Sequence, residues 1–376
     1  MTNVATPAVE VGVPTAPIPV PTKAELQAVI PAHCFQRKLS TSLRYAAFSV
    51  AATVIPGILA WLYLPLSLAW LPVWLLYSLV AGTAACGVWV VAHECGHDAF
   101  CDNRAVQDGI GFVLHSLLLV PYFSWQRSHA IHHAKTNHVT DGETHVPKRA
   151  ESEAGRRALA TRRGLGVTIH AGSAIVARLL FGWPLYLLTG ATGGPDRGVT
   201  NHFWPTRPFS RALFPSRWAS KVVLSAVGVL GVVGLLIASA LATGSVVPVV
   251  ALYVGPYLVC NAWLVAYTWL HHTSADTPHY DDPQWSFVRG AFCSIDRPYG
   301  RLLDLVHHHI GSTHVAHHLF ARIPHYHAVE ATEAIKAAYP ELYRYDPTPI
   351  PKALWQVSKH CVAVSPTDDG WRYTSF

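Results

Sequence analysis

The chain has 376 residues, of which 51% are hydrophobic and only 13% are charged, about half the charged share of an ordinary soluble domain. The mean hydropathy is positive, at +0.25, and the formal net charge is +6. This composition excludes an intrinsically disordered chain, a collagen-like chain and a nucleic-acid-binding arm. It favours a helical membrane protein over a soluble enzyme.

The N-terminal residues 1–44 are predicted to form a cytosolic lead-in. Residues 1–22 are rich in Pro, Val and Thr, and they lack the basic start and apolar core of a secretory signal. They also contain no Arg, which argues against a plastid or mitochondrial transit peptide. The seven cysteines are scattered and form no C-x-x-C motif, a pattern typical of reduced thiols rather than of a disulfide framework.

Two long stretches, Ala46–Ala92 and Val222–Ala275, contain no Asp, Glu, Lys or Arg. Each has about fifty residues, whereas one spanning helix needs about 20, so each stretch predicts two spanning helices and a short turn. The turns are expected at residues 64–67 and 242–245, where Pro65 and Gly244 interrupt the apolar pattern. The fold is therefore predicted to be an all-α integral membrane protein with four spanning helices in two hairpins.

Every Lys and Arg lies outside these hairpins, so the positive-inside rule places both termini and the middle segment in the cytoplasm. Two shorter apolar runs, Gly109–Trp125 and Ala171–Gly190, are interpreted as interfacial or half-inserted helices, and an arrangement with six spans stays open. Tyr326–Leu342 predicts an amphipathic helix in a cytosolic cap. The predicted segments are the lead-in 1–44, membrane hairpin 45–92, cytosolic or interfacial segment 93–221, membrane hairpin 222–270 and cytosolic segment 271–376.

Three histidine clusters with the spacing of metal ligands follow the predicted spans. The first reads H-E-C-G-H from residue 93, and the other two read H-x-x-H-H from residues 129 and 314. Histidines three or four residues apart share one face of a helix. Eight imidazoles are too many for one ion and suit a pair of ions, and imidazole suits Zn, Cu, Fe and Ni. The candidate ligands are His93, His97, His129, His132, His133, His314, His317 and His318.

Other interpretations of these clusters explain less of the sequence. The first cluster matches the H-E-x-x-H pattern of zinc hydrolases, but that reading accounts for neither H-x-x-H-H cluster. A metal transporter would carry ionisable groups near the middle of its spans, and the predicted spans have none there. A catalytically inactive scaffold is disfavoured because all eight histidines are present. A histidine-rich di-iron centre that activates O₂ accounts for all three clusters.

The order and spacing of the clusters resemble the three histidine boxes of the membrane fatty acid desaturase family. The sequences in and around the boxes are most similar to those of the microsomal oleate (Δ12, omega-6) desaturases. The resemblance runs from about Pro31 to Pro366. It is most specific at the boxes and weaker in the spans. The segments that carry it are His93–Phe100, Leu119–Trp125, Phe181–Leu187, Asp296–Gly300, His314–Phe320 and Ile323–His327.

The resemblance implies a chemistry, a set of partners and a location. Two iron ions held by the boxes would activate O₂ and remove two hydrogens from adjacent methylenes of a membrane lipid's acyl chain. An unactivated C–H bond is beyond the reach of any side chain, which agrees with a redox metal. The family usually receives its electrons from cytochrome b5 and its NADH reductase. Its active site would face the cytosol from the endoplasmic reticulum membrane.

The resemblance also implies a ninth ligand at the end of the last span, where His271 and His272 are the candidates. His272 is favoured because its position matches the second residue of the Gln-His-Thr-His sequence typical of oleate desaturases. Metal-bound histidines usually donate their second N–H to a carboxylate or carbonyl. Residues expected to support the ligands in this way are Glu94, His308 and Asp296, with Asp141 and Glu143 as similar candidates.

Three positions depart from the oleate desaturase pattern without removing a box histidine. Asp98 stands where the family usually has a further His, Ala130 where the plant enzymes usually have Arg, and Ser274 where they have the second His of Gln-His-Thr-His. These departures bear on the position of the double bond. A Δ12 desaturase is the leading prediction, and an omega-3 (Δ15) desaturase or a hydroxylase, epoxygenase or acetylenase of the same family is the alternative.

Overall fold

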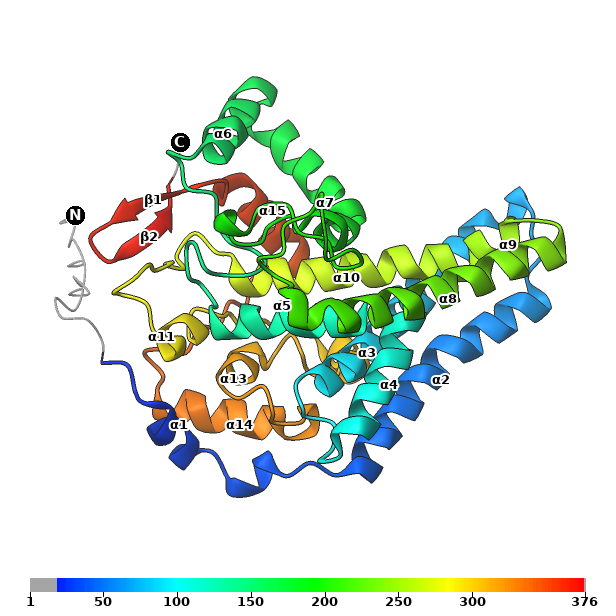
Figure 1. The fold of residues 1–376 in the computed structure, drawn as a ribbon, viewed down its shortest axis with the longest axis horizontal. Helices are drawn as coiled ribbons and strands as arrows, with labels where there is room; N and C mark the ends of the chain where they lie inside the picture. Colours follow the sequence, from blue (N-terminus) through cyan, green and yellow to red (C-terminus); the bar gives the residue numbers. More distant parts are fainter. Residues whose placement is uncertain (1–18, 375–376) are drawn as a thin grey trace, which may run out of the picture.

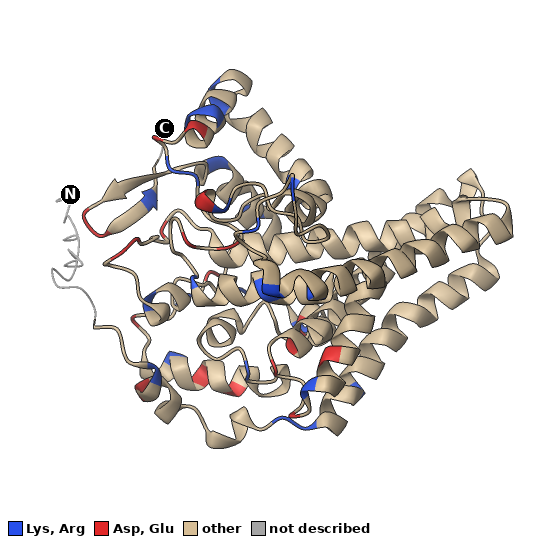
Figure 2. Ribbon diagram, in the orientation of Figure 1, with Lys and Arg blue, Asp and Glu red and all other residues tan. Residues whose placement is uncertain are grey.

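The computed structural model describes residues 19–374, so the first 18 residues of the predicted lead-in lie outside the described part of the chain. Long helices project to one side of the molecule, and shorter helices with two strands form a cap at the other side (Figure 1). Charged residues gather in the cap and around its junction with the long helices, whereas the far ends of the long helices carry none (Figure 2). This division matches a membrane bundle with a polar cap.

The first hairpin consists of α2 (Leu39–Tyr63) and α3 (Leu71–Gly96), with the short 3₁₀ helix η2 (Leu68–Trp70) between them. The turn falls where the sequence predicts it. Helix α3 is the central helix of the bundle, because 67% of its apolar window is buried inside the protein against 17% for α2. The outward side chains of α2 would meet lipid, in which exposed aliphatic groups carry no penalty.

The second hairpin begins with α8 (Ala219–Thr243) and turns at Gly244, which adopts the left-handed conformation with φ of +65°. The returning arm is α9 (Val247–Val249), the π-helical turn η5 (Val250–Val254) and α10 (Gly255–His272). Helix α10 packs directly on α3 at Gly82, where a Cβ atom would lie 2.4 Å from the carbonyl oxygen of Pro256. Only a glycine permits this approach, which brings the ends of both helices to the same place.

The middle segment also contains long helices. Helices α4 (Arg104–Leu117) and α5 (Tyr122–Ala134) meet at an angle of 103°. Helix α7 (Val167–Thr189) is a continuous apolar helix, although the sequence indicates only an interfacial one. Five helices in the described chain are long and apolar enough to cross a membrane, or six if the bent α4–α5 pair is one span. The chain is therefore a helical membrane protein, and the count of four spans stays a prediction.

The cap surrounds the ends of α3, α5 and α10. Its helix α14 (His325–Ala338) confirms the amphipathic helix predicted for this part of the sequence. The expectation of an all-α fold is wrong in one detail, because β1 (Val364–Thr367) and β2 (Gly370–Tyr373) form an antiparallel hairpin. Asp368 and Asp369 form the two-residue turn, and Gly370, which begins β2, has a φ of +130°.

Short elements complete the described fold. They are α1 (Lys23–Val29), η1 (Ala32–Phe35), α6 (Glu153–Leu165), η3 (Pro195–Arg197), η4 (Ser216–Trp218), α11 (Phe287–Ala291), α12 (Arg301–Val306), α13 (His314–Leu319) and α15 (Ile350–His360).

Candidate metal centre

Four helices end or pass at one place between the bundle and the cap, and each brings histidines to it. The first cluster lies in the last turn of α3 and at its C-cap, the second lies on α5, and the third opens α13. His272 is the last residue of α10. Residues that are more than 200 positions apart in the sequence therefore face one another.

Five histidines form the first group. Their ring nitrogens all lie within 4.8 Å of one another. The Nε2 atoms of His93 and His129 are 2.9 Å apart, those of His93 and His97 are 3.2 Å apart, and those of His129 and His133 are 3.2 Å apart. His317 completes the group, and its buried Nε2 has no hydrogen-bond partner among residues 19–374. Nitrogens that converge in this way are placed to share one metal ion.

Four histidines form the second group. The Nε2 atom of His272 lies 3.1 Å from that of His132 and 3.1 Å from that of His314. The Nε2 atom of His318 lies 3.1 Å from that of His314. The structure thus places His272 in this group. The neighbouring His271 is directed elsewhere, because its Nε2 lies 3.3 Å from the hydroxyl of Tyr299.

Each H-x-x-H-H cluster is divided between the two groups. On α5, the pair His129 and His133 faces the first group while His132 faces the second. On α13 the division is reversed, since His314 and His318 face the second group while His317 faces the first. Adjacent histidines on a helix point in different directions, whereas histidines four apart point the same way. The H-x-x-H-H spacing therefore directs histidines from one helix into two neighbouring groups.

The electrostatics of the cluster favour neutral imidazoles. Burial, together with charge repulsion from nearby histidines, holds the pKa of His314, His317 and His318 well below the usual value. Burial lowers the pKa of His97 to about 3. Neutral imidazole is the form that binds a metal. A purely imidazole donor set on nine buried or half-buried side chains fits two ions of the iron, copper, nickel and zinc group.

Two rings are oriented by hydrogen bonds at their second nitrogen. His132 Nδ1–H donates to the carbonyl oxygen of Glu143 at 2.7 Å. His318 Nδ1 lies 3.0 Å from the hydroxyl of Thr136, which itself donates to the carbonyl oxygen of His132. Both bonds leave the Nε2 lone pair facing the second group. Sequence reasoning did not find Thr136, although its place one turn after His132 was a usable signal.

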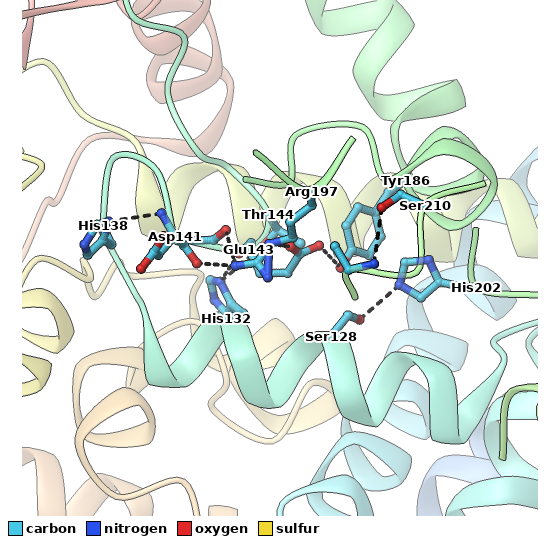
Figure 3. A network of polar contacts seen from close by, with 12 residues as sticks. Ser128, His132, His138, Asp141, Glu143, Thr144, Tyr186, Arg197, His202 and Ser210 are labelled. Carbon is cyan, nitrogen blue, oxygen red and sulfur yellow. Dashed lines mark hydrogen bonds and ion pairs between the residues drawn. The ribbon is translucent and has the colours of Figure 1, made fainter. Parts of the chain in front are cut away.

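The loop that carries Glu143, whose carbonyl group orients His132, is fixed by a polar network (Figure 3). The carboxylate of Glu143 is 3.0 Å from Arg197 Nε and accepts a hydrogen bond of 2.9 Å from the hydroxyl of Tyr186. Burial raises the pKa of Glu143 to about 7, and the Arg197 charge opposes that rise. Glu143 therefore acts on His132 through its backbone carbonyl, while its side chain anchors the loop. Arg197 and Tyr186 were not found from the sequence.

Comparison with known proteins agrees with this geometry. A family model described as fatty acid desaturase matches residues 68–349, which is most of the chain. The chain belongs to this family. It is 40% identical over 353 residues to the Delta(12)-fatty-acid desaturase FAD2 of Vernicia fordii, covering 93% of this chain and 88% of the relative. It is 39% identical to the endoplasmic reticulum omega-6 fatty acid desaturase of Brassica juncea, covering 93% and 89%.

A relative that is named for a different activity matches almost as well. The oleoyl-12-hydroxylase FAH12 of Ricinus communis is 38% identical over 355 residues, covering 93% of this chain and 88% of the relative. The fatty acid desaturase described here is an oxidoreductase, and its clustered histidines fit a histidine-ligated metal centre.

Glu94 of the desaturase is paired with the helix that follows the third box. Its Oε1 accepts the backbone N–H of His325 at 2.5 Å, and its Oε2 lies 2.6 Å from Nδ1 of the same residue. This pair joins the end of α3 to the start of α14. Sequence reasoning identified Glu94 as a support for a neighbouring ligand and did not find His325, because the contact joins residues 231 positions apart.

Asp296 acts on the third box through the backbone. Its Oδ1 accepts the N–H of Val315 at 2.8 Å, in the first turn of α13, and its Oδ2 accepts the hydroxyl of Tyr343 at 2.7 Å. A carboxylate at a helix N-terminus satisfies backbone N–H groups that the helix leaves unpaired. Asp296 is completely buried, and it therefore fixes the helix that carries His314.

Two other candidates lie apart from the metal-facing nitrogens. His308 Nε2 lies 2.7 Å from the hydroxyl of Ser49, and within residues 19–374 no hydrogen bond joins it to any of the nine histidines. It does share a small cavity with His93 and His317. Asp141 is partly exposed and lies 3.2 Å from Lys135 Nζ, as a surface ion pair does.

A mostly apolar cavity reaches the histidines from the bundle. Its walls come mainly from α3, α5, α7 and α10 and include the indoles of Trp89, Trp125 and Trp183, together with His129 and His132. Trp89 on α3 lines this cavity, whereas the aromatic residues Trp263 and Tyr267 on α10 do not. An apolar cavity that is lined by candidate metal ligands suits a hydrocarbon chain.

Proposed function

We propose that this desaturase is an O₂-dependent Δ12 acyl-lipid desaturase that converts oleoyl to linoleoyl chains on a membrane lipid. The observation that carries the proposal is the division of both H-x-x-H-H clusters between two groups of histidines beside an apolar cavity. The relatives that are named as Δ12 or omega-6 desaturases support the Δ12 position of the double bond.

Two iron ions are the proposed occupants of the two histidine groups. His93, His97, His129, His133 and His317 would hold one ion, and His132, His272, His314 and His318 would hold the other. When bound, iron supplies the O₂ chemistry that removes hydrogens from an unactivated methylene, which no side chain can do. The chain's own task is to keep nine imidazoles neutral and oriented, and to lead the acyl chain to them through an apolar passage.

The location and electron supply follow from the same proposal. We place the protein in the endoplasmic reticulum membrane with both termini and the metal centre in the cytosol. In this position cytochrome b5 and its NADH reductase would deliver the electrons. Segments 45–92 and 222–270 are proposed as the membrane hairpins. Segments 1–44, 93–221 and 271–376 are proposed to lie on the cytosolic side or at its interface. The uncharged far ends of the long helices support this topology.

The test is expression in yeast, which makes oleate, makes no dienes and supplies cytochrome b5. Gas chromatography of fatty acid methyl esters, with mass-spectrometric location of the double bonds, is expected to show new 18:2(Δ9,12). His317→Ala is expected to abolish the product, and His360→Ala, which changes an exposed histidine away from the centre, is expected to retain it. Absence of any new fatty acid with protein present in microsomes would contradict oleate as the substrate.

A second outcome is defined by the hydroxylase relative, which is 38% identical to this chain. If the new product is a hydroxy, epoxy or acetylenic fatty acid, the metal centre is retained as proposed and the Δ12 desaturase assignment is wrong. If linoleate must be fed before a product forms, and the product is a triene, the chain is an omega-3 desaturase.

A further inference from the structure

A second kind of metal-ligand cluster lies on the cap surface, apart from the nine histidines. It joins η1, near the N-terminus, to the first turns of α14, and Figure 1 shows this N-terminal part of the chain running beside α14. Its members are His33, Cys34, His327 and Glu330. The function proposed above uses none of them.

The four side chains are arranged around one point. One ligand atom from each, two imidazole nitrogens, a sulfur and a carboxylate oxygen, lie within 4.8 Å of one another. His33 Nε2 is 2.7 Å from Glu330 Oε2 and 3.9 Å from Cys34 Sγ. Ligands of a tetrahedral zinc ion are roughly 3.3–3.7 Å apart, given metal–ligand bonds of about 2.0–2.3 Å. Side-chain movements of about 1 Å or less would therefore complete the coordination.

The cluster has the chemistry of a zinc site. A thiolate, two imidazoles and a carboxylate match the borderline-soft character of Zn²⁺, and the Cys–His combination is common in structural sites. Within residues 19–374, the Glu330 carboxylate forms no ion pair with Lys or Arg, and its only ion-pair partner is His33. Cys34 is completely buried beside this carboxylate. A divalent cation would neutralise both the carboxylate and the thiolate.

The protein around the cluster already holds the ligands in place. Cys34 belongs to a buried apolar cluster with Leu26, Ile30 and residues of α13 and α14. His327 and Glu330 are three residues apart on α14 and therefore share one face of that helix. The backbone N–H of Lys38 donates to the hydroxyl of Tyr326 at 2.8 Å, just beyond the cluster. Ligands on two rigid elements that are already in contact need little reorganisation to bind an ion.

We propose that His33, Cys34, His327 and Glu330 bind one structural zinc ion that fastens the N-terminal segment to the helix following the third histidine box. Binding replaces the thiol proton of Cys34, which leaves to solvent as the Zn–S bond forms, and no electron is transferred. The same helix begins with His325, which pairs with Glu94 next to His93. The zinc site therefore stabilises the cap around the iron centre without belonging to it.

The experiment is elemental analysis of the full-length protein, purified from membranes in detergent with an affinity tag that contains no histidines. Wild type is expected to contain about one zinc per chain in addition to iron. Cys34→Ser and His327→Gln are each expected to lower zinc at least tenfold while iron stays unchanged. Cys361→Ser, another buried free thiol, and His360→Gln, another cap histidine, are the matched controls and should retain both metals.

Cobalt gives an independent measurement on the same proteins. After exchange of zinc for Co²⁺, wild type and the controls are expected to show a near-ultraviolet thiolate-to-cobalt charge-transfer band, and Cys34→Ser should lack it. Wild-type zinc below one tenth of an ion per chain, or equal zinc in wild type and the Cys34→Ser/His327→Gln variant, would overturn the proposal. Iron content and the elution profile in size exclusion report whether each variant is folded.

The outcomes of the two proposals are separable. Zinc that is bound through Cys34 in a protein that makes no new fatty acid would contradict the proposed Δ12 activity and leave the zinc site standing. Production of 18:2(Δ9,12) by a wild-type protein free of zinc would contradict the zinc site alone.

Discussion

The imidazole rings of His133 and His318 are stacked, with centroids 4.1 Å apart and planes at 12°. His133 faces the first group of histidines and comes from the second box, whereas His318 faces the second group and comes from the third box. The two stacked rings therefore connect the two proposed iron positions by direct packing. Because the rings pack on each other, a change at one position is expected to disturb the other.

Removing a single histidine from either group is therefore expected to affect both ions. His317→Ala takes one donor from the group of five, and His318→Ala takes one donor from the group of four and also removes the stack. Loss of a residue that only supports a ligand usually costs 10–100-fold in affinity or activity, so loss of a ligand should cost at least ~100-fold in activity. Iron analysis should find fewer than two ions per chain in both variants. Two retained irons with normal product formation would contradict the assignment.

The buried ion pair that anchors the loop of His132 gives a second prediction. Arg197→Gln removes the cation beside the Glu143 carboxylate, which is 1% exposed and keeps hydrogen bonds from the Tyr186 hydroxyl and the Gly194 backbone. Uncompensated burial of a charged group is expected to destabilise the protein by about 1–3 kcal/mol. Adding Glu143→Gln removes the charge, so the double variant is expected to be more stable than Arg197→Gln alone. Thermal unfolding in detergent measures both, and a double variant less stable than Arg197→Gln would contradict the prediction.

Asp296 gives a third prediction, because its carboxylate holds the first turn of the third-box helix through backbone N–H groups. Asp296→Ala leaves the buried N–H of Val315 without its acceptor, which should cost about 1–3 kcal/mol of stability. Asp296→Asn keeps an acceptor oxygen and should lose less. Tyr343→Phe, which removes only the contact to the other oxygen, is the matched control and should leave the iron content unchanged. Iron content that is equal in Asp296→Ala and wild type would show that this contact does not position His314.

How much of the site the sequence could predict depends on the distance between partners. The boxes were predictable because three- and four-residue spacing on a helix is local, and the turns at Pro65 and Gly244 were predictable for the same reason. The division of each box between two groups was not, because it depends on how α5 and α13 are rotated against each other. The pairing of Glu94 with His325, and the action of Asp296 on Val315, join segments that only the folded chain brings together.

The span count shows a different limit of sequence reasoning. Arg178 and Pro184 interrupt the apolar run of α7, a pattern that favours an interfacial helix in the sequence alone. The helix is nevertheless continuous over Val167–Thr189, since Pro184 lies inside it and the Arg178 guanidinium lies 4.1 Å from the ring centroid of Trp269. A cation that packs on an aromatic face is partly compensated by it. Charge counting alone cannot include such a tertiary contact.

Acid is expected to weaken iron binding and to lower folding stability, and the direction of both effects follows from the pKa shifts. Burial lowers the pKa of His97 to about 3 and holds that of His317 and His318 well below the usual value, whereas unfolded histidines titrate near 6.5. Below pH ~6.5 the unfolded chain therefore binds more protons than the folded chain, so folding stability falls as the pH is lowered. Protons also compete with iron for the same nitrogens. Between pH 8 and pH 5, iron release should increase and thermal stability should fall as the pH is lowered. Stability that rises on acidification would contradict this assignment.

The contact between α3 and α10 allows the most sharply controlled prediction, because the chain offers two helical glycines in opposite settings. At Gly82 an added Cβ would lie 2.4 Å from the Pro256 carbonyl oxygen, and a backbone atom cannot rotate away. Gly82→Ala is therefore expected to push the helices apart and to cost about 1–3 kcal/mol. Since α3 carries His93 and α10 carries His272, iron content and desaturation should fall with stability.

The matched control is Gly231→Ala on α8, where an added Cβ meets no atom within 4 Å. Alanine favours a helix over glycine by about 1 kcal/mol, so this variant should be neutral or slightly more stable. Thermal unfolding of the two variants in the same detergent, with iron content measured beside it, makes the comparison. Equal stability of Gly82→Ala and Gly231→Ala would show that the close α3–α10 contact does not set the position of the metal centre.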